Sequence, residues 1–205
     1  MNLFTLNNLF LLLTGLTSIY LLWRFYTRWS KEKGTYDVYY MMAFLVLLIS
    51  GLLLIFLGMD ILSSPFVLTV ASLIPLGISM GIAEQYYPKW KKAFKWFALI
   101  GFLAIAISGI AGIEIGRKIS VPIFHGAAGL VIFLGPILAK KAPKGFIWVG
   151  VGGVLIGLGG IALAFIANGS QLLFFSPDFV LMILSPLLLV MTLAFTYGFM
   201  KDIKA

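Results

Sequence analysis

Seven apolar stretches, each long enough to cross a lipid bilayer, fill almost the whole of this 205-residue chain. A membrane-spanning helix needs about 20 mostly apolar residues, since each residue adds about 1.5 Å. Only 11% of the residues are charged and 61% are hydrophobic, so a soluble fold could not bury the apolar surface. The sequence therefore predicts one domain over 1–205, an all-α bundle of seven transmembrane helices at about 3–23, 39–59, 65–86, 94–115, 122–139, 145–167 and 178–200.

The lysine and arginine residues predict the orientation of this bundle. Of the 15 basic residues, Arg117 and Lys118 fall on one side, and the other thirteen fall on the opposite side, in or beside alternate connections. Cytoplasmic loops carry such an excess. We therefore expect a multi-pass protein of the cell membrane with its N-terminus outside and its C-terminus in the cytoplasm. The net charge of +8 then reflects anchoring at the lipid bilayer, and no nucleic-acid partner is expected.

Titratable chemistry is sparse in this chain. Cysteine is absent and histidine occurs once, at His125. A chain without thiols forms no disulfides, no thiolate metal sites and no covalent haem links. Hydrolytic or redox chemistry would also call for more than one histidine and for paired acids. We therefore expect no catalytic residues, no metal site and no cofactor, and a protein that is not an enzyme.

A small group of polar residues gathers at the predicted outer ends of the helices. His125, Asp60 and Glu114 are candidates for an outer polar pocket, in which His125 would bind a substrate or a proton. Two other interpretations stay open. His125 could be a haem ligand, with only methionine as its partner, or a structural histidine near the interface. The two acids could instead be solvated and pair with Arg117 and Lys118.

Glu84 is the candidate residue on the inner side. Carboxylates inside membrane helices are costly and are usually functional. Glu84 also lies within a turn of a lysine cluster that begins at Lys89, so it could extend to the interface and pair there. Both interpretations are open on the sequence alone.

Small residues recur at helical spacing on two predicted helices. Such residues let two helix backbones come close in lipid, either inside the bundle or between subunits of a homo-oligomer or membrane complex. We expect Gly157→Leu to disrupt folding or assembly more than Leu155→Ala. The predicted contact faces are Gly150, Gly153, Gly157 and Gly160 on one helix, and Ser108, Gly112 and Gly116 on another.

Two segments resemble each other and suggest an internal repeat. Residues 64–68 and 176–181 both begin with Ser-Pro and continue with Phe-Val-Leu, the second after an inserted aspartate. Each opens a helix predicted to run from outside to inside. Helices one to three and five to seven would then be parallel repeats joined by helix four. Prolines inside three helices (Pro75, Pro136 and Pro186) are expected to bend them.

The seven-helix plan with parallel repeats resembles the sugar-transporting SWEET family. The chain departs from that family because its first helix has no proline. Microbial rhodopsins share the helix count, but residues 179–200 contain no lysine to carry retinal. In length, bare loops and glycine-rich sixth helix the chain also resembles uncharacterised small seven-helix membrane proteins predicted in archaea, a likeness that implies no function.

Two functions follow from these patterns. The first is a non-enzymatic subunit or accessory scaffold of a membrane assembly, indicated by the small-residue faces and the scarcity of charge at mid-membrane. The alternative is a small-solute or ion transporter or channel with parallel three-helix repeats. An outer pocket containing His125, Asp60 and Glu114 would favour the alternative.

Overall fold

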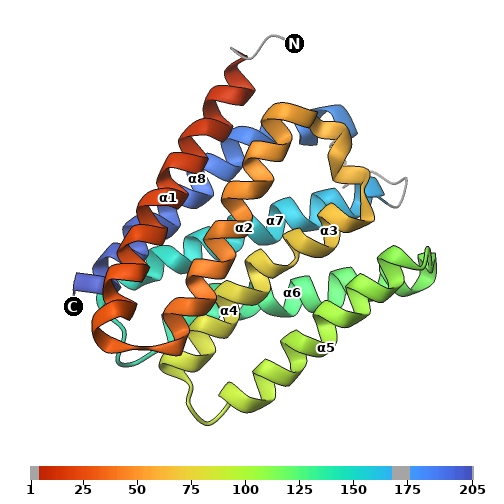
Figure 1. Ribbon diagram of the computed structural model, residues 1–205. Helices are drawn as coiled ribbons and strands as arrows, with labels where there is room; N and C mark the ends of the chain where they lie inside the picture. Colours follow the sequence, from red (N-terminus) through yellow and green to blue (C-terminus); the bar gives the residue numbers. More distant parts are fainter. Residues whose placement is uncertain (1–4, 168–175, 205) are drawn as a thin grey trace.

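The computed structural model describes residues 5–167 and 176–204, and these ranges are almost wholly helical (Figure 1). Within them seven helices are long and apolar enough to cross a membrane, which confirms the helical fold class predicted from the sequence. The helices are α1 (Leu6–Glu32), α2 (Thr35–Leu57), α3 with α4 (Pro65–Ala71 and Leu73–Tyr86), α5 (Lys91–Ile110), α6 (Glu114–Leu138), α7 (Ile147–Ala167) and α8 (Pro177–Lys204), with short 3-10 turns η1 (Met59–Ser63) and η2 (Lys144–Phe146).

The first helix is longer than its apolar stretch. The basic residues after position 23 were interpreted as a connection, yet α1 continues through them to Glu32. Arginine and lysine are good helix formers, so they do not end a helix by themselves. The end comes at Lys33, which adopts a left-handed conformation and donates its N–H to the carbonyl of Trp29 at 2.8 Å. The predicted start at residue 3 lies outside the described residues.

The predicted contact face of Ser108, Gly112 and Gly116 on one helix is wrong. Gly112 has a φ of +67° and stops α5. The N–H of Ile113 bonds the carbonyl of Ser108 at 2.9 Å, and the N–H of Gly112 bonds that of Gly109 at 3.4 Å, the pattern of a Schellman C-cap. Gly116 therefore belongs to α6, where it faces Ser108 across the turn. The helix predicted from residue 122, which is α6, also starts much earlier, at Glu114.

The third membrane-length helix is broken in two at Ser72. Pro75 has no N–H to donate to Ala71, and its ring would clash with that carbonyl. The hydroxyl of Ser72 donates to the carbonyl of Thr69 at 2.6 Å and satisfies one backbone group near the break. The bend expected at Pro75 is therefore present, and α3 leans away from the line of α4 (Figure 1).

Six of the seven membrane-length helices form a closed ring. In order around the ring they are α1, α2, α3–α4, α6, α7 and α8, and α8 packs back on α1. The fourth, α5, lies outside this ring against α3, α4 and α6 (Figure 1).

The connections rich in basic residues lie at one end of the ring. Arg28 near the end of α1 contacts Asp202 near the end of α8, and Gln85 near the end of α4 contacts the same carboxylate. Gly145, just before α7, lies against Lys201. We call this the basic end and the opposite one, which holds η1 and the α5–α6 turn, the distal end.

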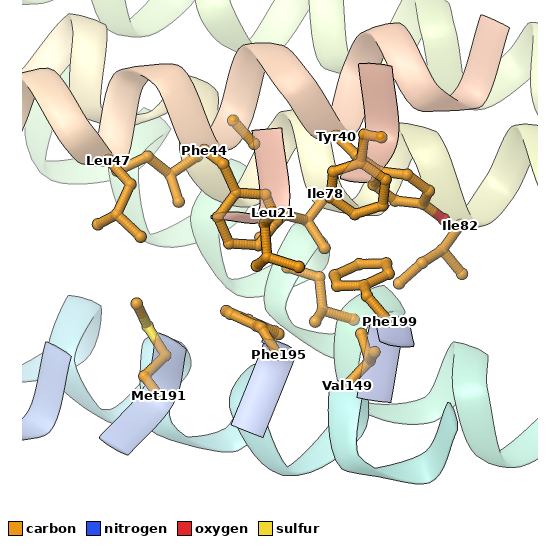
Figure 2. Close-up of a cluster of buried hydrophobic side chains, with 14 of the residues drawn as sticks. Leu21, Tyr40, Phe44, Leu47, Ile78, Ile82, Val149, Met191, Phe195 and Phe199 are labelled. Carbon is orange, nitrogen blue, oxygen red and sulfur yellow. The ribbon is translucent and has the colours of Figure 1, made fainter. Parts of the chain in front are cut away.

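The basic half of the ring is filled by aromatic side chains. Figure 2 shows rings from α2 meeting rings from α8, with aliphatic side chains of α1, α4 and α7 around them. Neighbouring ring centroids lie 4.7–6.2 Å apart, within the range of favourable aromatic pairs. We call this group the aromatic plug; it consists of Phe25, Tyr40, Phe44, Phe146, Phe195 and Phe199, all with 0% exposure.

Candidate functional site

The distal half of the bundle contains a cavity of about 740 Å³. Ligand pockets commonly measure about 300–1,000 Å³ and have apolar walls with a few polar groups. The wall of this cavity is mostly apolar and comes from η1, α3, α5, α6, α7 and α8. Its polar or charged lining residues are Asp60, Ser63, Ser72, Arg117 and His125.

His125 is the deepest of the charged or titratable residues in this distal cavity. It follows Arg117 by eight residues on α6, which corresponds to a depth of about 12 Å. Its ring is hydrogen-bonded to the backbone of Ile156 in α7, and Nε2 is buried with no hydrogen-bond partner among the described residues. In the neutral ring that remaining nitrogen is an acceptor. The wall of the cavity therefore holds one buried acceptor that no described residue satisfies.

Gly160 makes room for this imidazole. A Cβ atom added at Gly160 would overlap the His125 ring. Because Gly160 has no side chain, α7 can pass beside His125. Gly160 and His125 both line the distal cavity. Gly160, one residue of the predicted glycine face, therefore makes room for His125 at the cavity in addition to lying on a helix contact.

Asp60 and Arg117 bring opposite charges to the same cavity. Asp60 lies in η1 and Arg117 in the second turn of α6. Neither side chain forms an ion pair with any residue that the structure describes. Glu114, which the sequence grouped with Asp60 and His125, lies outside the cavity. Its side chain is 73% exposed and pairs with Lys118 at 3.7 Å.

Two other glycines of the predicted face bring α7 against α6. A Cβ at Gly150 would lie 2.8 Å from the carbonyl oxygen of Phe133, and one at Gly153 would lie 2.8 Å from the nitrogen of the same residue. A Cβ at Gly157 would meet nothing within 4 Å. The predicted face is therefore a contact inside the chain, but the substitution chosen to test it, Gly157→Leu, falls at its roomiest position.

A buried charge network closes the basic end, and the sequence interpretation missed it. Arg28 donates from Nη2 and Nε to Asp37 of α2 at 2.6 and 2.9 Å, and from Nη1 to Asp202 of α8 at 2.6 Å. Asp202 also accepts from Gln85 at 3.1 Å and from the hydroxyl of Tyr86, both near the end of α4. The three charged side chains are at most 6% exposed. This Arg28 network ties α1, α2, α4 and α8 together.

The spacing of buried residues was the signal that could have revealed this network. On α1 the buried positions Leu21 and Phe25 are followed three residues later by Arg28. On α8 the buried Phe195 and Phe199 are followed three residues later by Asp202. Steps of three and four keep side chains on one helix face. Both charges therefore continue inward-facing stripes, whereas Arg28 was interpreted as one of the cytoplasmic anchoring charges.

Glu84 pairs with the lysines of the basic end. Its carboxylate lies 2.8 Å from the Lys95 ammonium and 3.5 Å from that of Lys91, and it accepts a hydrogen bond from Thr35 at 3.0 Å. The side chain of Glu84 is 10% exposed. This arrangement is the pairing at the interface that the sequence offered as one of two interpretations.

Comparison of the chain with protein-family models, with curated proteins and with solved structures finds no match. Among the described residues no group of three or more histidine, aspartate or glutamate side chains is placed to hold a metal ion. The arrangement of the site therefore has to be interpreted from its own chemistry: a roomy, mostly apolar cavity with charges near one end and a lone acceptor at depth.

Proposed function

We propose that this protein binds a small solute in the distal cavity and acts in its permeation across the membrane. The observation that carries the proposal is the buried, unpartnered Nε2 of His125 in the wall of a cavity of about 740 Å³ that Asp60 and Arg117 also line. Buried polar groups are normally hydrogen-bonded, so an acceptor left without a described partner in the wall of a ligand-sized space fits a binding site.

The part of the bundle between the distal cavity and the basic end fits the same function. Ile132 follows His125 by seven residues on α6, about 10 Å toward the basic end, and belongs to the hydrophobic cluster around the aromatic plug. Beyond the plug lies the Arg28 network. A cavity on one side, with a hydrophobic plug and an ion-pair network on the other, is the arrangement expected of a permeation protein in a state closed toward the basic end.

Orientation and location complete the proposal. The basic end faces the cytoplasm and the distal cavity faces outward, on the positive-inside rule, so the N-terminus is outside and the C-terminus inside the cell membrane. The protein is not an enzyme under this proposal. The hypothesis of an accessory subunit loses its main argument, because the glycines of α7 that indicated an association face pack against α6 and His125.

Thiol labelling tests the cavity and the orientation together. The chain contains no cysteine, so single cysteines can be introduced without altering the background. A membrane-impermeant thiol reagent added to intact cells should label Val121→Cys, which lines the cavity, and should spare Ile78→Cys, whose side chain is 0% exposed beside the plug. Labelling of neither variant, or of both alike, would contradict an outward-facing cavity.

A solute screen then tests binding. Amino acids, organic acids, amines and polyols are added to the purified protein, and thermal unfolding in detergent is followed. A solute that binds should raise the melting temperature of the parent protein and of Glu114→Gln, because Glu114 lies outside the cavity. Its effect should shrink in Asp60→Asn and in His125→Ala. A protein that responds to no solute and purifies with a second membrane protein would favour the accessory-subunit hypothesis instead.

A further inference from the structure

A second cavity lies on the outer surface of the bundle, between α5 and α6. It measures about 240 Å³ and is lined by Trp90, Ala93, Phe94, Phe97, Ala127 and Val131. Trp90, which caps α5, and the three residues from α5 are spaced by three, one and three positions, so they lie along one face of that helix. No charged residue lines this α5–α6 groove. An apolar hollow on the lipid-facing side of a membrane bundle suits a hydrocarbon chain.

Two lysines lie at the level of the chain where the groove begins. Lys89 immediately precedes Trp90, and Lys92 follows it in the first turn of α5. Both lysines are exposed and form no ion pair with any described residue, whereas Lys91 and Lys95 share the carboxylate of Glu84. The first turn of α5 contains no acidic residue. The charge of these two lysines is therefore left for a partner outside the chain.

Trp90 places this charge at the level of the lipid headgroups. Its side chain is 68% exposed at the basic end, next to the short turn between α4 and α5. Exposed tryptophans concentrate at the membrane–water interface, because the ring is apolar and its N–H donates a hydrogen bond. Lysines at this level meet lipid phosphates, and the groove continues from them toward the membrane interior along Ala93, Phe94 and Phe97 of α5.

We propose that the α5–α6 groove binds an anionic phospholipid, with one acyl chain in the groove and the headgroup phosphate on Lys89 and Lys92. Basic pockets between transmembrane helices on the cytoplasmic side bind anionic headgroups in this way. The position of α5 outside the ring gives the lipid a role, because a lipid in the groove would add contacts between α5 and α6 to those that the two helices already make. This inference does not depend on the solute-binding function proposed for the distal cavity.

Native mass spectrometry of the detergent-purified protein tests the site with phosphatidylglycerol and phosphatidylcholine of equal chain length. Phosphatidylglycerol should bind more tightly. Each lysine near an anionic headgroup contributes about 1 kcal/mol of binding free energy. The double variant Lys89→Gln with Lys92→Gln should therefore lower the affinity for phosphatidylglycerol by roughly 30-fold. The matched pair Lys31→Gln with Lys33→Gln removes the same charge at the end of α1, a helix that does not line the groove, and should leave the affinity unchanged.

A second variant separates the groove from the charge. Ala127→Leu fills the hollow without altering any charge and should lower the affinity for both lipids. Glycerol phosphate, a headgroup without acyl chains, should not compete with phosphatidylglycerol for the site. Ala93→Leu repeats the test from the α5 side if Ala127→Leu melts early in lipid-free detergent. Equal losses in the two lysine pairs, full competition by glycerol phosphate, or a second copy of the chain bound in place of lipid would each overturn the proposal.

Discussion

The Arg28 network makes a sharp prediction about stability, because two carboxylates share one guanidinium. Replacing Arg28 by glutamine leaves Asp37 and Asp202 buried without a cation. Among the described residues Asp37 then keeps no side-chain partner, whereas Asp202 keeps Gln85 and Tyr86. Breaking a buried ion pair from one side costs about 3–5 kcal/mol.

Asp202→Asn should behave differently from Arg28→Gln. It leaves one guanidinium facing one carboxylate, a balanced pair, and the amide oxygen can still accept from Arg28. We expect a loss of about 1 kcal/mol, the net contribution of one hydrogen bond. The order of destabilisation should therefore be Arg28→Gln first, and Asp202→Asn well behind it.

Thermal unfolding in mild detergent, followed by the circular dichroism of the helices, measures the difference. A loss of 3–5 kcal/mol in a chain of this size lowers the melting temperature by about 6–20 °C. As a control, Arg28→Met combined with Asp37→Leu and Asp202→Leu removes all three charges and should recover part of the loss. Melting of Arg28→Gln within two degrees or so of the parent protein, or an equal drop in Asp202→Asn, would refute this reasoning about buried charge.

Three further predictions concern other parts of the molecule. Gly153→Leu should cost about 1–3 kcal/mol by forcing α7 away from α6, whereas Gly157→Ala should be tolerated because its Cβ would meet no atom within 4 Å; equal melting temperatures would contradict this. A reporter fused after Ala205 that is active only outside the cell should stay silent, and activity would reverse the proposed orientation. Purified protein should show no Soret absorbance, because a single histidine in a chain without cysteine is a poor haem site; a Soret band lost in His125→Ala would show a haem site instead.

The sequence predicted the helical class because bilayer thickness fixes how long an apolar stretch must be. It did not predict where those helices end. Charged residues were interpreted as connections, yet α1 continues past Arg28 to Glu32 and α6 starts at Glu114, in both cases with charged residues inside a helix. Hydropathy indicates which part of a helix lies within the membrane, whereas the ends of the helix depend on local caps such as Lys33 and Gly112.

The candidate site was predictable in part for a topological reason. Asp60 and His125 come from segments that a seven-helix chain must return to the same end, so their placement at one end of the bundle follows from the helix count. Glu114 comes from that end too, but its side chain is 73% exposed and pairs with Lys118. The direction of the Glu114 side chain depends on how α6 is rotated about its axis. The sequence interpretation started this helix at residue 122, so it did not place Glu114 on α6 at all.

The order of helices in the ring bears on the repeat suggested by the two Ser-Pro segments. Consider an exchange of α1 with α6, of α2 with α7, and of α3–α4 with α8. Under this exchange every helix pair of the ring becomes another pair of the ring. The pair α1/α2 becomes α6/α7, the pair α2/α3–α4 becomes α7/α8, and the pair α8/α1 becomes α3–α4/α6. A two-fold axis along the membrane normal generates this pairing. It also leaves α5 without a counterpart, outside the ring, as a helix that only joins two parallel halves must be. Any closed ring of six helices in chain order allows this pairing, so the internal repeat stays a prediction. The wall of the distal cavity combines residues of both proposed halves with Ile105 of α5, because it is lined by η1, α3, α5, α6, α7 and α8.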